Sequence, residues 1–385
     1  MSSKRDPGAK APKVGLCFRP IQAWYSAEVN ATGKRSLVFN SYYAQRPLFA
    51  NELKIPCGGC LGCRMMRSSA WAMRGVYEAR EHDANSYITL TYDDEHLPEN
   101  GSLCKKDFQD FMKRLRKAFP DAKIRYYYCG EYGPDKSRPH YHAAIFGLQF
   151  DDLEPWSERE GIITYTSQKL ADLWGNGFVT VGEVTYESLA YIARYVMKKI
   201  TGRGAQEKDP VTGLRPYDKL LPGGEVVALL PEFNDMSRGH RCKEHRGLPS
   251  RPKDCDSCSG GIGYKFFDKY CSDVFPDCFL VHKGRKVPAP KYFYSLLEKS
   301  DPELYAKVKA ERAEYARANK FDPDKSPRRL RDREQVAERY FAGMKERGLH
   351  KQRGASGDPL RAVAAKARRS ARVSESARML RGLVK

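Results

Sequence analysis

The sequence lacks any long apolar run. No stretch approaches the roughly 18 to 20 apolar residues that a membrane-spanning helix requires. The first ten residues, Met-Ser-Ser-Lys-Arg-Asp-Pro-Gly-Ala-Lys, contain no apolar segment of the kind found in secretory signal peptides. These two absences lead us to expect a soluble cytoplasmic protein that makes no membrane contact.

Two further features are scarce or missing. No Gly-x-x-x-x-Gly-Lys-Ser/Thr motif occurs, so the chain shows no P-loop of its own. Acidic residues are in the minority, with 48 Asp and Glu against 68 Lys and Arg and a net charge of +20. This excess predicts a polyanionic partner, either nucleic acid or an anionic membrane, and the alternative is a solvated basic surface. The 41% hydrophobic and 11% aromatic content excludes a fully disordered chain.

The 11 cysteines are odd in number and clustered in the sequence. In a reducing compartment this favours thiols or metal ligands over disulfides. Cys57, Cys60 and Cys63 are spaced Cys-x-x-Cys-x-x-Cys, and a tetrahedral Zn²⁺ site would need one further ligand. An iron–sulfur cluster is the rival, although the fourth Cys and following Pro of the ferredoxin-type run are absent. Unligated thiols are the third alternative.

A second cluster lies further along the chain. Cys242-x-x-His245 is followed, after nine residues, by Cys255-x-x-Cys258. Ligand type and pair spacing suit a small zinc knuckle.

Residue patterns predict an antiparallel sheet with flanking helices, an α+β fold. β-Branched and aromatic runs predict strands over residues 86–92, 123–131, 139–147 and 178–184. The turn Gly133-Pro134-Asp135 would join the second and third of these strands into a hairpin. Amphipathic patterns predict helices over residues 64–81, 105–119 and 186–199, with Thr185 as the N-cap of the last.

The predicted hairpin carries two histidines. His140 and His142 would point to the same face of the sheet, because side chains alternate along a strand. Two imidazoles form half of a divalent-metal site, and Glu131 on the neighbouring strand would add a carboxylate oxygen. Such a set leaves positions open for water or substrate. The alternative is a pair of solvated or packed histidines.

The last predicted helix carries two tyrosines. Tyr191 and Tyr195 share a face because they are four residues apart, and Lys198 and Lys199 follow within a turn. An aromatic stripe packed on the core is the alternative interpretation.

Together these motifs resemble the rolling-circle replication initiators of the HUH endonuclease superfamily and, more specifically, the replication proteins of gokushovirus-like microviruses. The resemblance runs from about Leu16 to Lys199 and resumes weakly near Gly261-Ile262-Gly263. The residues that carry it lie in five runs, namely Pro56 to Arg64, Ile88 to Pro98, Cys129 to Gly133, Arg138 to His142 and Tyr191 to Lys199.

The resemblance implies a nickase that acts on single-stranded DNA at a phage origin, in the cytoplasm of a bacterial host. A tyrosine hydroxyl would form a 5′-phosphotyrosine and free a 3′-hydroxyl, and later strand joining would release circular DNA. The catalytic candidates are Tyr191, Tyr195, Lys198 and Lys199, and His140, His142 and Glu131 would bind Mg²⁺ or Mn²⁺. A host helicase and DNA polymerase are implied partners. The alternative is a non-catalytic zinc-containing protein that stacks Tyr126, Tyr127 and Tyr128 on bases.

The resemblance also bears on the cysteines and on the DNA contacts. It implies Cys17 as the fourth ligand of the first cluster, because the family carries a Cys near its N-terminus in a similar Pro-Ile context. The second cluster looks like an insertion relative to the family, so a stabilising clip and an origin contact both stay open for it. Candidate phosphate contacts are Arg64, Arg67, Arg138 and Arg194.

These expectations divide the chain into four parts. A flexible basic arm over 1–13 precedes a nicking domain over 14–205. A Gly/Pro- and Cys/His-rich extension follows over 206–299, and a basic helical region over 300–385 ends the chain, with eight Lys or Arg residues and one Glu in 361–385.

Overall fold

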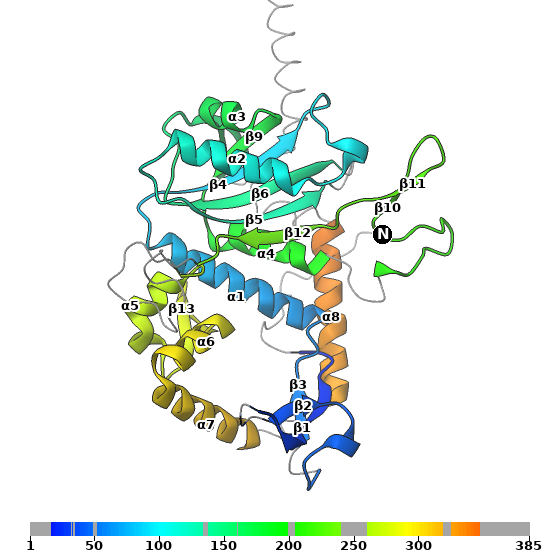
Figure 1. Cartoon of the computed structure of the whole chain (residues 1–385), viewed down its shortest axis with the longest axis vertical. Coiled ribbons are helices and arrows are strands. Elements are labelled where there is room, and N and C mark those ends of the chain that lie inside the picture. Colours follow the sequence, from blue (N-terminus) through cyan, green and yellow to red (C-terminus); the bar gives the residue numbers. More distant parts are fainter. Residues whose placement is uncertain are drawn as a thin grey trace, which may run out of the picture. The chain divides into compact units, whose positions relative to one another are not determined.

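A computed structural model describes residues 17–31, 33, 35–48, 52–133, 138–159, 161–198, 205–239, 260–318 and 325–346 (Figure 1). The predicted arm over 1–13, the Cys242–Cys258 cluster and the basic end of the chain lie outside the described residues. The chain divides into two compact units. The first comprises residues 1–67 and 307–348, and the second comprises residues 68–306 and 349–385.

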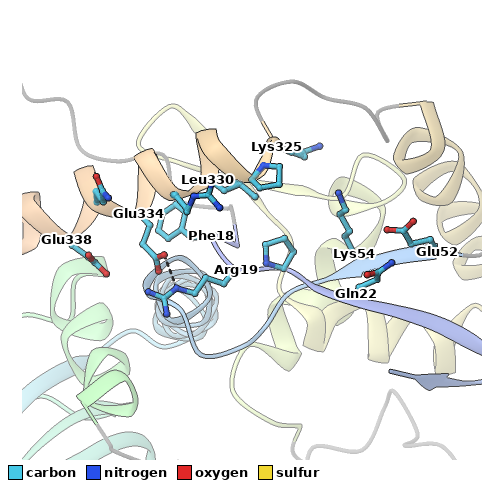
Figure 2. A pocket seen from close by; sticks show the side chains of 13 residues that line it. Phe18, Arg19, Gln22, Glu52, Lys54, Lys325, Leu330, Glu334 and Glu338 are labelled. Carbon is cyan, nitrogen blue, oxygen red and sulfur yellow. Dashed lines mark hydrogen bonds and ion pairs between the residues drawn. The ribbon is translucent and has the colours of Figure 1, made fainter. Parts of the chain in front are cut away.

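The first unit contains a small antiparallel sheet with the strand order β2-β1-β3. Its elements are β1 (Ile21–Val29), β2 (Arg35–Val38), the short 3-10 helix η1 (Ser41–Tyr43), β3 (Glu52–Ile55) and α8 (Pro327–Glu346). The unit also holds the first turns of α1 (Leu61–Ala79) and most of α7 (Pro302–Ala318), because the boundaries between the units fall within these two helices. A cavity of about 650 Å³ lies between α8 and the strands β1 and β3 (Figure 2).

The second unit is built on a seven-stranded sheet with the order β12-β5-β6-β4-β9-β8-β7. All neighbouring strands in it are antiparallel. The strands are β4 (Asn85–Tyr92), β5 (Arg125–Tyr132), β6 (Pro139–Phe146), β7 (Glu154–Arg159), β8 (Ile162–Thr166), β9 (Gly177–Gly182) and β12 (Phe233–Met236). The predicted α+β fold and its four predicted strands are therefore confirmed.

Each face of this sheet is covered by helices, as Figure 1 shows. The helices α2 (Lys105–Ala118) and α3 (Gln168–Trp174) bury Phe108, Phe111 and Trp174 against one face. On the other face, α1 and α4 (Tyr186–Lys198) bury Ala72, Leu189 and Ile192. Burying large apolar side chains in two layers supplies the main driving force for folding this unit.

The period of two in β4 decides which side chains reach which face. Ile88 and Leu90 belong to the core beneath α2 and α3, whereas Tyr87 belongs to the core beneath α1 and α4. Thr89 points the same way as Tyr87, and its hydroxyl lies 3.0 Å from Nδ1 of His142. The α4 side of the sheet is therefore where polar groups enter an otherwise apolar layer.

The remaining elements of the second unit come from the region that the sequence predicted to be an extension beyond residue 205. β12 pairs with β5 and adds an edge strand to the main sheet. The other elements are the hairpins β10 (Asp218–Leu220) with β11 (Val226–Ala228) and β13 (Phe279–His282) with β14 (Arg285–Pro288), the helices α5 (Tyr264–Val274) and α6 (Lys291–Ser300), and the short 3-10 helix η2 (Glu99–Gly101). The edge of the sheet therefore does not coincide with the predicted boundary.

A buried charge cluster attaches the Gly261-Ile262-Gly263 segment to this unit. Glu78 of α1 accepts a hydrogen bond from the Gly263 N–H at 2.6 Å and pairs with Nε of Arg125 at 3.1 Å. Nε of Arg74 donates to the Ile262 carbonyl at 2.9 Å. Both arginines are buried, so their charges serve this contact rather than a DNA surface.

Candidate active site

The β5–β6 register brings three predicted ligands together. Glu131 of β5 lies directly opposite His140 of β6, and His142 is two residues further along the same face. Nε2 of His140 lies 2.6 Å from Oε1 of Glu131, and Nε2 of His142 lies 3.0 Å from the same oxygen. The sequence-based placement of these three residues on one sheet face is confirmed.

The imidazoles are oriented by hydrogen bonds at their other nitrogen. Nδ1 of His140 lies 3.1 Å from the carbonyl oxygen of Arg138, to which it can only donate. Nδ1 of His142 lies 3.0 Å from Oγ1 of Thr89. The ring of His142 is also stacked on Tyr87, with ring centroids 5.9 Å apart. These contacts aim both Nε2 atoms at Glu131, the arrangement in which metal-binding histidines are usually held.

Glu131 is an ionised carboxylate in a buried place. Its residue is 2% exposed. Burial acts to raise its pKa, but the adjacent His140 and His142 outweigh this effect and hold the pKa at about 2. The side chain is therefore a negative charge at every physiological pH.

The second oxygen of Glu131 supports the fit of a metal. Oε2 is buried and has no hydrogen-bond partner in the described part of the chain. An unpaired buried carboxylate oxygen is costly, so such an atom needs a partner that the protein atoms do not supply. The ligand atoms of Glu131, His140 and His142 lie within 4.8 Å of one another. Two imidazoles and one carboxylate suit Mn²⁺ or Mg²⁺ with open positions for other ligands.

Tyr191 points into this same group. Its hydroxyl donates a hydrogen bond to Oε1 of Glu131 at 3.0 Å, and its ring meets the ring of His142 edge-on at 4.9 Å between centroids. The residue is 8% exposed. The start of α4 is fixed by Thr185, whose hydroxyl accepts from the Ser188 N–H at 3.2 Å, as an N-cap does. The predicted cap is therefore confirmed.

The other predicted catalytic residues are only partly described. Tyr195 and Lys198 lie on α4, one and two turns after Tyr191, and the structure describes their backbone alone. Lys199 lies outside the described residues. The roles assigned to these three residues stay predictions.

The four candidate phosphate contacts are distributed over both units. Arg138 pairs with Asp94 and donates to the Tyr92 carbonyl at 3.0 Å, so it holds the start of β6 to the end of β4. The guanidinium of Arg194 lies 5.8 Å from the ring of Tyr191. Arg64 and Arg67 belong to the first unit, where exposed Arg67 donates to the Gly58 carbonyl at 3.4 Å. Only Arg194 is therefore seen beside a predicted catalytic group.

The run of three tyrosines is not a base-stacking platform, and this part of the sequence interpretation is wrong. Tyr127 and Tyr128 are buried, on opposite faces of the sheet. Tyr127 stacks on Trp71, and Tyr128 stacks on Phe108. Only Tyr126 is partly exposed. Alternation along the strand was the signal that could have shown that three consecutive residues never share a face.

The sequence analysis also missed the groups that support the histidines. Thr89 and Tyr87 contact His142, and neither was a candidate. Their position on the strand β4, next to β6, is the feature that brings them there. A polar Thr amid the apolar side chains of a buried strand was the available signal.

The first cysteine cluster is assembled in the first unit, as predicted. The sulfur atoms of Cys17, Cys57, Cys60 and Cys63 all lie within 4.8 Å of one another. Burial acts to raise the pKa of Cys60, but N–H donors from Cys63 and Phe18 outweigh it and hold the pKa at about 6.

Comparison with known proteins agrees with this site. A family model of the replication-associated protein ORF2 type matches residues 85–200, which hold Glu131, both histidines and Tyr191. The replication-associated protein VP4 of Bdellovibrio phage phiMH2K is 30% identical over 313 residues, which cover 78% of this chain and 84% of that protein. The replication-associated protein ORF2 of Spiroplasma virus 4 is 31% identical, over 79% of this chain and 88% of that protein.

A third relative, replication-associated protein ORF4 of Chlamydia phage 1, is 39% identical over 64% of this chain and 54% of its own length. No solved structure matches the chain. The α+β fold, the site and these similarities define a replication-associated protein. More specifically, the chain belongs to the family of replication-associated proteins of microviruses. Among the described helices, none has the length and apolarity that crossing a membrane requires.

Proposed function

We propose that the chain is a rolling-circle replication initiator of the HUH endonuclease type, which nicks single-stranded DNA at a phage origin through Tyr191. One observation carries the proposal. The Tyr191 hydroxyl, both histidines and Glu131 converge on a single carboxylate oxygen, at distances of 2.6 to 3.0 Å. A phenol beside a candidate metal centre is the arrangement that tyrosine attack on a phosphodiester requires.

The chemistry needs help from the surroundings of the phenol. A phenol with a pKa of about 10 is only about 0.1% ionised at neutral pH. The hydrogen bond to Glu131 fixes the direction of the Tyr191 oxygen before DNA binds. Mg²⁺ or Mn²⁺ held by His140, His142 and Glu131 would supply positive charge to the non-bridging oxygens of the scissile phosphate.

The reaction balances without a nucleotide cofactor. The Tyr191 oxygen forms a bond to phosphorus, and the bond from phosphorus to the 3′-oxygen breaks. The phenol loses one proton, and the departing 3′-oxygen gains one. The products are a 5′-phosphotyrosine and a free 3′-hydroxyl, which a host polymerase can extend. Because the ester keeps the energy of the broken bond, the reverse attack by a 3′-hydroxyl rejoins DNA, in keeping with the missing P-loop.

A second tyrosine gives the cycle its end. Tyr195 lies four residues after Tyr191 on α4, and we propose that it cuts the regenerated origin while Tyr191 is still esterified. The new 3′-hydroxyl would then attack the phosphotyrosine and release a unit-length circle. We also propose that a host helicase unwinds the template in the bacterial cytoplasm, and that Lys198 and Lys199 hold the phosphate.

The net charge of +20 would hold the DNA in a salt-sensitive manner. Arg194 is the best-placed candidate for the phosphate, because it follows Tyr191 on α4 and its guanidinium lies near that ring. We propose that Arg138 acts instead on the fold of the site, since its guanidinium is already engaged by Asp94 and Tyr92.

A covalent-adduct assay tests the proposal. The full-length protein is incubated with single-stranded DNA of its own phage origin and Mn²⁺, then denatured and separated on a gel. We expect a protein–DNA adduct whose phosphorylated peptide contains Tyr191. Cleavage without an adduct would indicate a hydrolase that uses water, and binding without cleavage would favour a non-catalytic nucleic-acid-binding protein.

A further inference from the structure

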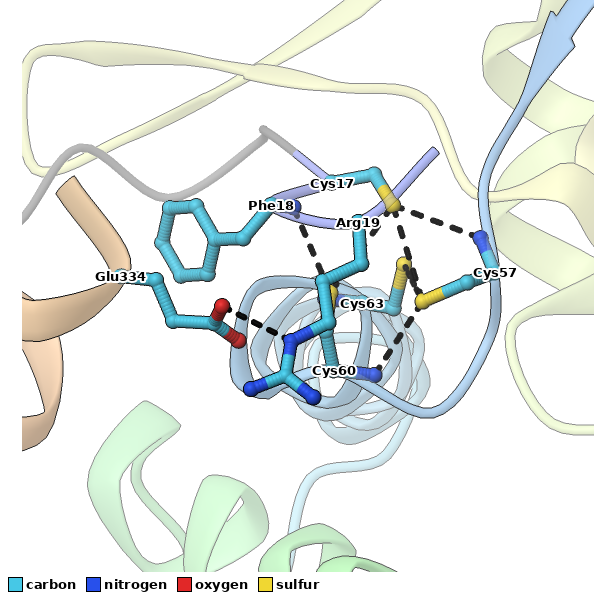
Figure 3. Close-up of polar contacts among 7 residues, drawn as sticks. All are labelled: Cys17, Phe18, Arg19, Cys57, Cys60, Cys63 and Glu334. Carbon is cyan, nitrogen blue, oxygen red and sulfur yellow. Dashed lines mark hydrogen bonds and ion pairs between the residues drawn. The ribbon is translucent and has the colours of Figure 1, made fainter. Parts of the chain in front are cut away.

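The first unit holds four cysteines whose sulfur atoms face one another, as Figure 3 shows. The distance between Sγ atoms is 3.7 Å for Cys17 and Cys57 and 3.8 Å for Cys17 and Cys60. It is 3.9 Å for Cys57 and Cys63. These thiols come from a segment before β1, from the loop before α1 and from the first turn of α1, so the chain has been folded to collect them.

These distances select one kind of occupant. A disulfide requires about 2.05 Å between sulfurs, so none of these pairs is bonded. Four thiolates at about 2.3 Å from a Zn²⁺ ion at the centre of a tetrahedron are about 3.8 Å apart. The distances of 3.7 to 3.9 Å match that edge. A cubane of four irons and four sulfides needs more room between its cysteine sulfurs than these distances leave.

Backbone N–H groups point at the same sulfurs. Cys57 N–H donates to Sγ of Cys17 at 3.3 Å, and Cys60 N–H donates to Sγ of Cys57 at 3.3 Å. Phe18 N–H and Cys63 N–H donate to Sγ of Cys60 at 3.4 and 3.5 Å. Such donors stabilise the negative charge of metal-bound thiolates and fix the positions of the ligands.

The unit has little else to hold these segments together. In its described part, the buried apolar side chains are few and mostly small, namely Phe18, Ala23, Ala44, Cys60, Cys63, Val308, Leu330 and Ala337. Phe18 packs with Cys60, Cys63 and Ala337 of α8. Arg19 pairs with Glu334 of α8 at 2.8 Å, but its side chain is 69% exposed, and exposed ion pairs contribute little. Small units of this kind are commonly stabilised by a structural metal.

We infer that Cys17, Cys57, Cys60 and Cys63 bind one structural Zn²⁺, which joins the segment before β1 to the start of α1 and, through Phe18 and Arg19, supports α8. The inference concerns the first unit and is independent of the nicking reaction. A failed adduct assay would leave it standing, and absent zinc would leave the tyrosine chemistry standing.

Metal content tests the inference directly. Full-length wild type and Cys57→Ser are purified without chelator, and zinc per chain is measured by elemental mass spectrometry and native mass spectrometry. We expect the variant to hold one zinc fewer than wild type. The matched control is Cys104→Ser, a half-buried cysteine at the N-cap of α2, which should leave zinc unchanged. The difference between proteins is decisive, because the Cys242–Cys258 cluster contributes equally to all three.

Wild type alone provides the second test, should Cys57→Ser fail to fold. The intact protein is alkylated before and after a zinc chelator, and the modified cysteines are mapped by peptide mass spectrometry. We expect Cys17, Cys57, Cys60 and Cys63 to react only after chelation, with a lower thermal midpoint, while the reactivity of Cys104 is unaffected. Equal zinc in wild type and Cys57→Ser, iron in place of zinc, or alkylation unaffected by the chelator would overturn the inference.

Discussion

The hydroxyl of Tyr191 lies 3.0 Å from Oε1 of Glu131, the oxygen that both His140 and His142 also approach. The two residues are 60 positions apart in the sequence and come from different layers, a helix and the sheet that it covers. This contact couples the candidate nucleophile to the candidate metal ligands through one atom. Any change at Glu131 therefore alters both the charge at the metal centre and the direction of the phenol.

Replacing Tyr191 by Phe should abolish covalent adduct formation at the first cut. The substitution removes one oxygen atom and leaves a ring that still packs against His142. Loss of the nucleophile should reduce cleavage by on the order of 10³-fold or more. The measurement is the rate of adduct formation on origin DNA with Mn²⁺. Unchanged Mn²⁺ binding would show that the site is intact, and full cleavage by Tyr191→Phe would refute the assignment.

Replacing Tyr195 by Phe should have a different effect. If Tyr191 makes the first cut and Tyr195 the second, Tyr195→Phe should form adduct at the wild-type rate and fail to release circles. A nicking assay on a single origin and a circularisation assay on a substrate with two origins separate the two steps. Full cleavage and circularisation by both single variants would show that one tyrosine suffices.

Thr89→Val should weaken metal binding without removing a ligand. The Thr89 hydroxyl lies 3.0 Å from Nδ1 of His142 and orients that ring. Losing such a supporting group typically lowers metal affinity by about 10- to 100-fold. We expect the Mn²⁺ concentration for half-maximal cleavage to rise accordingly, with the rate recovering at high Mn²⁺.

The matched control for that experiment is Thr180→Val. Thr180 lies opposite Thr89 on β9 and is equally buried, at 3% exposure. A structural effect of losing a buried hydroxyl should appear in both variants, whereas the shift in Mn²⁺ dependence should appear only with Thr89→Val. Equal shifts would show that Thr89 acts through the fold alone.

Local patterns were enough to predict the core of the candidate site. Alternation placed His140 and His142 on one face, and the short turn placed Glu131 on the neighbouring strand. A spacing of four residues identified the tyrosine pair on α4. The antiparallel α+β fold followed from the same local signals, because hairpins and amphipathic helices are encoded within short segments.

Contacts between distant segments were not predictable. β12 joins β5 across about a hundred residues, and its four residues carry no pattern that names a partner. Glu78 and Arg74 look like solvent-facing charges of an amphipathic helix, yet both are buried against the Gly261-Ile262-Gly263 segment. Pairing of a buried charge depends on which groups tertiary folding brings to it, and sequence periodicity does not contain that information.

Glu78→Gln should destabilise the second unit and flatten its response to acid. Burial acts to raise the pKa of Glu78, but the hydrogen bond from His82 and the charge of Arg125 outweigh it and lower the pKa below its ordinary 4.5. The unfolded state therefore binds the proton more readily, so this stabilisation is present above about pH 4.5 and is lost as the pH falls through the folded pKa. Breaking a buried pair costs about 3 to 5 kcal/mol.

Urea unfolding followed by tryptophan fluorescence between pH 7 and pH 4 measures this effect. The control is Glu187→Gln, which breaks a more exposed pair with Lys283 and should cost at most about 1 kcal/mol. A wild-type stability that does not fall more steeply with acid than that of Glu78→Gln would contradict the assignment.

Gly263→Ala should loosen the same cluster from the opposite side. Gly263 has a φ of +81°, which an alanine adopts at a cost of about 1 to 2 kcal/mol. A Cβ there would also lie 3.3 Å from the Arg74 carbonyl oxygen, and the N–H that donates to Glu78 has no room to shift. Gly284→Ala isolates the backbone cost, since Gly284 has a φ of +72° with nothing within 4 Å of its Cβ position. A larger loss of unfolding free energy for Gly263→Ala than for Gly284→Ala is therefore the expected result, and equal losses would mean that the Glu78 contact adapts without penalty.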